Sequence, residues 1–145
     1  MFSMKAVVPG VSAIIVDNVR KIEKIVMVQR EHEPWKGKWV IPGGRIEFGE
    51  KIYTALKREV YEETNLRIRI LSHVCTFDLI IYNNKQPVYH FIIINYLAYP
   101  VGGKLKAGSD ASDAKWMSIK EIKDLINKNM APKILKTPLR KLNLI

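Results

Sequence analysis

Three glutamates in the middle of the chain have the spacing and the chemistry of a site for a divalent cation. Glu59, Glu62 and Glu63 occupy positions i, i+3 and i+4, so on a helix their carboxylates lie on neighbouring turns of one face. Like charges this close repel one another and lose solvation, and a bound cation offsets both effects. Mg²⁺ prefers hard oxygen ligands, usually carboxylates together with water and phosphate oxygens. The alternative is a charged helix edge on which Arg58 and nearby lysines pair with the glutamates.

The helix that carries these glutamates is expected over residues 51–64, a stretch without glycine or proline. On a helical wheel its apolar residues form one continuous arc, which consists of Ile52, Ala55, Leu56 and Val60. Glu59 and Glu63 fall inside that arc, and Glu62 lies at its edge. Carboxylates directed toward a core need compensation, but the helix alone does not choose between a metal ion and Arg58.

The residues that surround these glutamates favour ligand binding. Gly43 and Gly44 allow backbone carbonyls and amides to come close to a ligand. Glu50 stands where a carboxylate favours a helix N-terminus. Arg58 directly precedes Glu59, and its guanidinium fork can hold a carboxylate in one orientation. Together these features favour the metal-binding interpretation.

Residues 44–66 resemble the Nudix box. The box consists of Gly, five residues, Glu, seven residues, Arg-Glu, an aliphatic residue, any residue, Glu-Glu, any residue, Gly and an aliphatic residue. The corresponding positions here are Gly44, Glu50, Arg58, Glu59, Val60, Glu62, Glu63, Asn65 and Leu66. Only Asn65 departs from the pattern, and asparagine is the next residue after glycine to tolerate a left-handed helix end. Residues 39–44 and 116–119 also look like the segments that flank the box in this family, so the resemblance covers nearly the whole chain.

The resemblance implies the Nudix α/β/α sandwich and the Mg²⁺-dependent cleavage of a phosphoanhydride bond, with Mn²⁺ as a substitute ion. It assigns Glu59 and Glu63 as the main metal ligands, with Glu62 on the same or a second ion. The carbonyl of Gly44 is expected to complete the coordination. Arg58 and Glu50 are expected to hold the carboxylates in place, a role that often matters nearly as much as direct ligation.

Members of this family often take a further ligand or a general base from the loop before the last strand. The corresponding segment here contains Asp110 and Asp113. Asp110, six residues before Trp116, is the first choice. The alternative is that both aspartates only make turn hydrogen bonds.

Several residues outside the box are expected to line the substrate site. Tyr89 and Phe91 share one face of a strand and His90 takes the other, and an aromatic ring at that place could stack on a nucleobase. A lone histidine on a strand is more often structural. The full set of predicted substrate-binding residues is Arg30, Arg45, Trp35, Tyr89 and His90.

The elements that must position these residues alternate between strands and helices. Helices are expected at 51–64 and, after a capping box formed by Ser118 and Glu121, up to about residue 128. A short helix after residue 131 would have Pro132 at its first position, with its length limited by Pro138. Residues 100–113 are expected to form a loop. Strands are expected at 5–17, 24–30, 39–41, 67–82 and 88–99, with a hairpin turn at 83–85. The order predicts an α+β fold with a mixed β-sheet sandwiched between α-helices, in a single domain over 1–145.

Composition narrows the class of protein. The chain has 145 residues and a net charge of +10, so nucleotides, RNA and acidic membranes are all plausible partners, although the charge could serve solubility alone. The single cysteine, Cys75, excludes an intrachain disulfide, is expected to be inert, and favours a cytoplasmic location. No apolar stretch is long enough to span a bilayer, and of the partners that the charge allows, a membrane is not expected.

The resemblance leaves the substrate open. Residues 90–116, and 107–111 in particular, look like small Nudix proteins named ADP-ribose pyrophosphatases, so ADP-ribose is the first choice. The alternatives are a MutT-like hydrolase of oxidised nucleoside triphosphates, an RNA 5′-end hydrolase, and a non-catalytic Nudix-fold binding module. A homodimer is compatible with the resemblance. The basic tail, at about 129–145, is expected to dock through its leucines, with RNA binding as the less favoured hypothesis.

Overall fold

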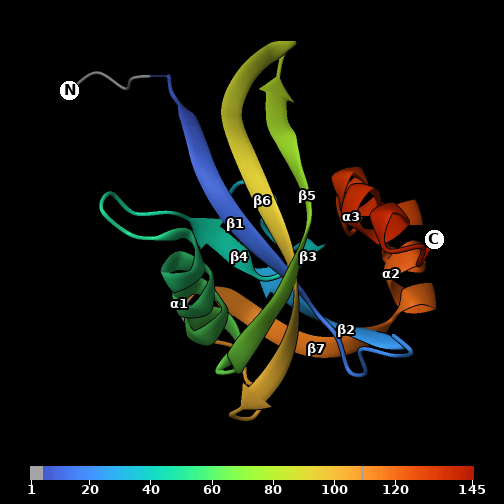
Figure 1. Cartoon of the computed structure of the whole chain (residues 1–145). Helices are drawn as coiled ribbons and strands as arrows, with labels where there is room; N and C mark the ends of the chain where they lie inside the picture. Colours follow the sequence, from blue (N-terminus) through green and yellow to red (C-terminus); the bar gives the residue numbers. More distant parts are fainter. Residues whose placement is uncertain (1–4, 109) are drawn as a thin grey trace.

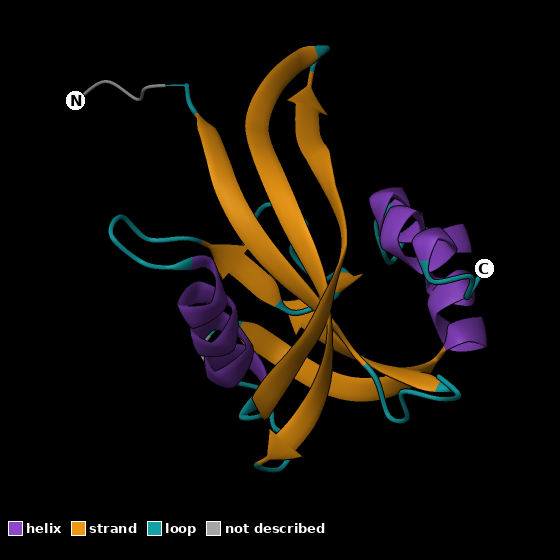
Figure 2. Cartoon of the chain, viewed as in Figure 1, coloured by secondary structure: helices purple, strands orange, loops and turns teal. Residues whose placement is uncertain are grey.

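The computed structural model describes residues 5–108 and 110–145 and has the predicted α+β class (Figures 1 and 2). Its elements in chain order are β1 (Val7–Ile15), β2 (Lys24–Arg30), β3 (Trp39–Val40), β4 (Gly43–Arg45), α1 (Ile52–Thr64), β5 (Arg67–Asn83), β6 (Gln86–Gly102), β7 (Ala111–Ser118), α2 (Ile119–Asn127), the 3-10 helix η1 (Lys133–Leu135) and α3 (Lys136–Lys141). Among the described residues, no helix is long and apolar enough to cross a membrane.

The strands form two sheets, whereas the sequence predicted one mixed sheet. The four-stranded sheet has the order β4-β1-β6-β5 and is mixed, because β1 runs parallel to β6 while the other pairs are antiparallel. The second sheet has the order β3-β2-β7 and is antiparallel. It forms separately because β2 meets the end of β1 only through a bridge between Val16 and Ile25. α1 lies on one side of the four-stranded sheet, and α2 and α3 lie on the other (Figure 1).

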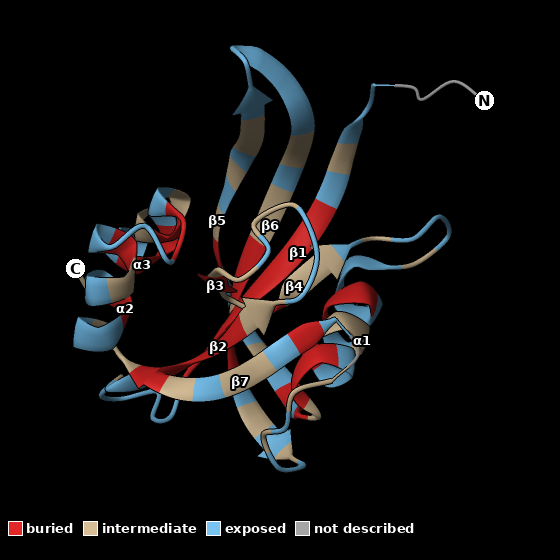
Figure 3. Ribbon diagram, turned by 180° about the vertical axis from the view of Figure 1, so that it is seen from behind, coloured by how far each residue is buried: buried red, intermediate tan, exposed pale blue. Residues whose placement is uncertain are grey.

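Strand β1 supplies both hydrophobic cores and is buried over most of its length (Figure 3). Because alternate side chains of a strand point to opposite faces, Val11, Ala13 and Ile15 pack with Ala55, Leu56 and Val60 of α1. The residues between them, such as Ile14, pack against a second cluster that includes Trp39 and residues of α2 and the tail. The position of β1 therefore fixes α1 relative to the rest of the fold.

Three segments differ from the sequence-based prediction. Residues 43–45, which lie outside every predicted strand, form β4 because their backbone pairs with β1, with Ser12 opposite Gly43 and Gly10 opposite Arg45. The predicted hairpin turn is present, with left-handed backbone at Asn84 and Lys85, but β6 continues to Gly102. The expected loop at 100–113 is correspondingly shorter, since β7 begins at Ala111.

The C-terminal segment is part of the second core. The predicted capping box is present: the Ser118 hydroxyl accepts a hydrogen bond from the Glu121 backbone amide at 3.1 Å, and the Glu121 carboxylate accepts one from the Ser118 amide at 3.1 Å. Pro132 precedes η1 instead of starting it. Pro138 lies in the first turn of α3 and does not end it, because a first-turn residue needs no backbone donor. Leu135 and Leu139 are buried, together with Ala131, so the tail docks through its apolar residues as predicted.

The end of α1 tests the interpretation of Asn65. Asn65 is left-handed, with φ 64°, and its side-chain amide donates to the carbonyl of Lys104 at 3.0 Å. We expect Asn65→Gly to change the free energy of unfolding by less than about 1 kcal/mol. Glycine adopts the left-handed conformation with less strain, and this gain offsets the lost hydrogen bond to Lys104. Asn65→Val should cost about 2 kcal/mol, because a β-branched residue fits this conformation poorly and also loses the bond. Urea unfolding would measure both, and equal values for the two variants would contradict the capping role.

Candidate active site

Helix α1 places two carboxylates against the body of the protein. Its apolar residues Leu56 and Val60 are fully buried in the core. Glu59 and Glu63 follow on the adjacent part of the helix surface, and Glu63 is only 7% exposed. The helical wheel placed both carboxylates inside the apolar arc, and Glu63 is buried there, whereas Glu59 is only half-buried.

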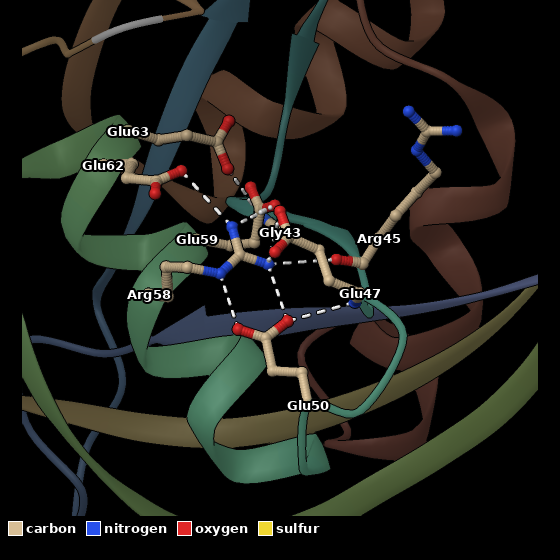
Figure 4. A network of polar contacts seen from close by, with 8 residues as sticks. All are labelled: Gly43, Arg45, Glu47, Glu50, Arg58, Glu59, Glu62 and Glu63. Carbon is tan, nitrogen blue, oxygen red and sulfur yellow. Dashed lines mark hydrogen bonds and ion pairs between the residues drawn. The ribbon is translucent and has the colours of Figure 1, made fainter.

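Arg58 is the centre of the polar network around these carboxylates (Figure 4). Its guanidinium donates to both carboxylate oxygens of Glu50, with Nε to Oε2 at 2.6 Å and Nη2 to Oε1 at 2.8 Å. Nη1 donates to Glu59 Oε1 at 2.9 Å and to Glu62 Oε2 at 3.4 Å, and Nη2 donates to the Arg45 carbonyl at 3.2 Å. Arg58 therefore fixes the orientation of the glutamates relative to the β4 backbone.

Glu50 serves this network and does not cap the helix. Hydrogen bonds from Arg58 lower the pKa of Glu50 to about 2, and those bonds also raise the pKa of Arg58. The residue at the helix N-cap is Lys51, whose side chain makes no capping hydrogen bond, and the first turn contains no acidic residue. Glu50 lies just before the helix N-terminus, where a carboxylate was expected to be favourable, and in the structure this carboxylate is engaged by Arg58.

Glu63 is held by a backbone amide. The N–H of Gly43 donates to Glu63 Oε1 at 2.9 Å. Burial raises the pKa of Glu63 to about 8 despite this bond, and the negative charges of Glu59 and Asp110 act in the same direction, whereas Arg30 lowers it. Burial likewise raises the pKa of Glu59. Both carboxylates are costly to ionise in the absence of an added positive charge.

The two glycines before the helix have no room for a side chain. A Cβ at Gly44 would overlap the carboxylate of Glu59, and a Cβ at Gly43 would overlap the carbonyl of Val11. The sequence-based reasoning assigned a ligand role to the Gly44 carbonyl but missed that Gly43 anchors Glu63. The local signal for it was the Gly-Gly pair itself.

The donor set fits a hard divalent cation. Glu59 and Glu63 provide carboxylate oxygens that burial has desolvated, and the carboxylate of Glu59 lies against the backbone at Gly44. Within residues 5–108 and 110–145, no three acidic, imidazole or thiol groups converge closely enough to surround one ion. Glu59 and Glu62 instead face Arg58, so sharing one ion would require their side chains to rotate away from it.

A cavity of about 1190 Å³ opens beside these carboxylates. It brings together most of the residues predicted for the site, but Arg58, Glu50 and Glu62 are not among its lining residues. The predicted residues that line it are Arg30, Trp35, Gly44, Arg45, Glu59, Glu63, Tyr89, His90 and Asp110.

Asp110 lies at the rim of this cavity, on the side of the loop after β2. Its carbonyl accepts a hydrogen bond from the Glu31 amide at 3.2 Å, and its carboxylate lies 3.7 Å from Nε2 of His32. His32 also lines the cavity and was missed, because nothing local in the sequence relates it to a residue so far along the chain. Asp113 lies within β7, where it accepts from the Ala114 amide at 2.8 Å, and it does not line the cavity.

Two arginines bring positive charge to the same cavity. Arg30 ends β2, as predicted, and its Nε donates to the carbonyl of Pro34 at 2.6 Å. The side chain of Arg45 extends away from the carboxylate network (Figure 4). Trp35 is half-buried in the intervening loop and has a left-handed backbone, with φ 66°.

The hairpin contributes an aromatic wall. The rings of Tyr89 and Phe91 stack on one face of β6, with centroids 5.9 Å apart. His90 points to the opposite face, where Nε2 lies 3.0 Å from a carboxylate oxygen of Asp78, so its imidazole has a structural partner.

On β5, burial raises the pKa of the Cys75 thiol, which keeps it protonated, in line with the expected inert role.

The model of the family described as "NUDIX domain" matches residues 7–137. The chain belongs to the Nudix family. The expected resemblance is thereby confirmed over nearly the whole fold, and the site described above coincides with the Nudix box.

Three relatives illustrate the range of this Nudix family. The chain is 33% identical over 114 residues to the ADP-ribose pyrophosphatase of Methanocaldococcus jannaschii. This alignment covers 78% of the chain and 66% of that protein. It is 32% identical over 89 residues to the 8-oxo-dGDP phosphatase NUDT18 of Mus musculus, covering 61% of the chain but 25% of that protein. A bifunctional NMN adenylyltransferase/ADP ribose pyrophosphatase from Francisella tularensis, solved with AMP and a manganese ion, superposes with a TM-score of 0.69 at 26% identity, covering 97% of the chain and 42% of that structure. The chain thus spans just under two thirds of the length of the Methanocaldococcus protein and less than half of the length of the other two.

The Arg58 guanidinium binds Glu50 and Glu59 at the same time, and we expect that the single ammonium group of a lysine cannot replace it. Arg58→Lys can keep the charge but not the paired bonds to Glu50 together with the bond to Glu59. We expect the affinity for Mg²⁺, measured by calorimetry, to fall about tenfold or more. Lys57→Arg, at the exposed neighbouring position, is the control and should bind Mg²⁺ as the unchanged protein does. Unchanged affinity in Arg58→Lys would refute the orienting role.

The raised pKa of Glu63 predicts a pH-dependent stability in the absence of metal. Between the ordinary value of 4.5 and about 8, folded Glu63 keeps a proton that the unfolded chain has released. The free energy of unfolding should therefore fall as the pH rises through this window, by about 1.4 kcal/mol per pH unit at most. In EDTA, the melting temperature of Glu63→Gln, which stays neutral, should rise relative to that of the unchanged protein between pH 5 and 8. Parallel melting curves would contradict the assignment.

Proposed function

We propose that this chain is a Mg²⁺-dependent hydrolase of a nucleoside diphosphate linked to another group, with ADP-ribose as the leading substrate. The observation that carries the proposal is the composition of one cavity. The cavity is lined at one end by the desolvated carboxylates of Glu59 and Glu63. The cationic side chains of Arg30 and Arg45 also line it. The aromatic rings of Tyr89 and Phe91 line it from the hairpin. Such a cavity suits a ligand with an anionic middle and an aromatic end.

The size of the cavity supports a substrate longer than a simple phosphate. Arg45 lies opposite Gly10 on β1, and Phe91 lies opposite Val8 on the other side of the same strand. Two strand spacings and two residues along the strand separate the Arg45 and Phe91 backbones by roughly 12 Å. A nucleoside diphosphate can span that separation, with its base on the wall formed by Tyr89 and Phe91.

The proposed roles follow from the positions of the side chains. Bound Mg²⁺ would neutralise phosphate oxygens and make the phosphorus more susceptible to water. Glu59 and Glu63 would hold the ion, with Glu62 and the Gly44 carbonyl as the remaining ligands, and Arg58 would keep the carboxylates oriented. Mn²⁺ is a reasonable substitute, since the Francisella relative was solved with manganese.

The reaction itself needs a group to accept a proton from water. Asp110, exposed at the rim and close to His32, is the proposed general base. Water attacks one phosphorus of the anhydride, the bond between that phosphorus and the bridging oxygen breaks, and the second phosphate leaves with the bridging oxygen. From ADP-ribose the products are AMP and ribose 5-phosphate. Arg30 and Arg45 would stabilise the charge of the phosphates on either side of that bond.

A second substrate class is a MutT-like one. The similarity to an 8-oxo-dGDP phosphatase supports oxidised nucleotides, which would use the same carboxylates and aromatic wall. The buried leucines of the tail support docking in place of a dedicated RNA-binding arm, so capped or triphosphorylated RNA ranks behind small nucleotides.

Turnover of a substrate panel tests the proposal. Purified protein with Mg²⁺ should release phosphate from ADP-ribose, after coupling to a phosphatase, faster than from 8-oxo-dGDP, 8-oxo-dGTP or capped RNA. Glu63→Gln keeps the shape and removes a ligand charge, so kcat should fall at least about a hundredfold. Glu23→Gln, on the exposed turn after β1, should retain full turnover. Turnover by Glu63→Gln at the unchanged rate would rule out the assigned role, and no turnover of any nucleotide by the unchanged protein would favour a binding module.

A further inference from the structure

A buried polar pair joins the two central strands of the four-stranded sheet. Ser12 on β1 and Asn95 on β6 lie opposite each other in the parallel register. The side-chain amide of Asn95 donates to the Ser12 hydroxyl oxygen at 2.7 Å. Ser12 is 7% exposed and Asn95 is fully buried. Polar side chains at such positions are costly unless their hydrogen-bonding groups are satisfied.

This pair is not fully satisfied. The carbonyl oxygen of Asn95 has no hydrogen-bond partner among the described residues. Leaving a buried acceptor unpaired costs about 1–3 kcal/mol, whereas a leucine of similar shape would cost nothing of this kind. The neighbouring residues on this face of β6, Ile93 and Leu97, are apolar. Asn95 therefore departs from the pattern of its own strand without a stabilising reason.

The pair lies next to the candidate active site. Ser12 lines the same cavity as Glu59 and Glu63. It stands opposite Gly43 on β4, and a Cβ at Gly43 would meet the Ser12 backbone and side chain. The amide of Gly43 in turn binds the Glu63 carboxylate at 2.9 Å. A ligand that reached Ser12 would therefore lie beside the carboxylate end of the cavity and not beside its aromatic wall.

The direction of the hydrogen bond determines what Ser12 can offer. Because Asn95 is the donor, the hydroxyl oxygen of Ser12 is an acceptor in the pair and its proton stays available. The opposite amide orientation would make Ser12 donate inward and would leave the Asn95 amide unpaired. The observed orientation leaves the Ser12 proton free for another acceptor, and Ser12 lines the cavity that the phosphates of the proposed substrate would occupy.

We propose that the Ser12 hydroxyl donates a hydrogen bond to a phosphate oxygen of the ligand, and that Asn95 is a positioning residue that keeps this hydroxyl a donor. The ligand class is a pyrophosphate-containing anion. The inference rests on the proposed function for the nature of the ligand, but it concerns binding, so it can be tested without turnover.

Calorimetric binding of inorganic pyrophosphate in the presence of Mg²⁺ is the test. Ser12→Ala should raise the Kd about tenfold, as expected for a lost hydrogen bond to a charged group. Asn95→Leu should raise it by a similar factor without lowering the melting temperature, because the unpaired carbonyl is removed. The double variant should bind no more weakly than Ser12→Ala, since Asn95 acts through Ser12. Ser72→Ala, at an exposed serine of β5, should bind like the unchanged protein.

The outcomes separate this inference from the proposed function. If Ser12→Ala binds pyrophosphate as tightly as the unchanged protein, or if the unchanged protein does not bind it, the inference is overturned whatever the turnover of ADP-ribose. If Asn95→Leu alters only the melting temperature, the positioning role is overturned. If the Leu variant does not fold, Asn95→Ala carries the same comparison. Loss of pyrophosphate affinity in Ser12→Ala, without turnover of ADP-ribose by the unchanged protein, would support the inference and refute the proposed substrate.

Discussion

Two neighbouring carboxylates on α1, Glu63 buried and Glu59 half-buried, repel each other and have lost much of their solvation, and the surrounding structure reduces that cost. Arg58 binds Glu59 and is itself fixed by two bonds to Glu50. A backbone amide of β4 binds Glu63, and β4 can approach so closely because Gly43 lacks a side chain. The packing of β4 on β1, the loop before α1 and the orientation of the helix all depend on this arrangement. These contacts only partly compensate the lost solvation, so the pKa of Glu63 stays raised. A bound cation would favour the ionised form of this carboxylate.

The parts of this arrangement that depend on local spacing could be predicted from the sequence. Helix α1, the shared face of its glutamates and the partnership of Arg58 with Glu59 follow from positions a few residues apart. The left-handed end of α1 at Asn65 and the tight turn at Asn84 follow from the backbone preferences of asparagine. The alternation of Tyr89 and Phe91 on one face of a strand is also local. In each case the deciding interaction lies within one element or one turn.

The parts that depend on distant pairing could not be predicted. The division into two sheets depends on which strands β2 joins, and the periodicity of a strand does not specify its neighbour. His32 meets Asp110 only because the loop after β2 folds over the start of β7. Ser12 and Asn95 are 83 residues apart, and each reads as an ordinary strand position. Single-sequence patterns carry no information about such contacts, so the contact of His32 with Asp110 and the polar pair emerge only in three dimensions.

The participation of the tail in the second core has a consequence for how the chain is made. Residues of β1 and β2 such as Ile14 and Ile25 pack with Leu135 and Leu139, so they cannot be covered until nearly the whole chain has been synthesised. The core beneath α1 uses residues up to β6 and Trp116, and it can close earlier during translation. The side of β1 that α1 covers can therefore be packed while the opposite side, which also lines part of the cavity, is still uncovered. Premature termination before Leu139 would leave this second cluster incomplete, with apolar side chains of β1 and β2 uncovered and prone to aggregation.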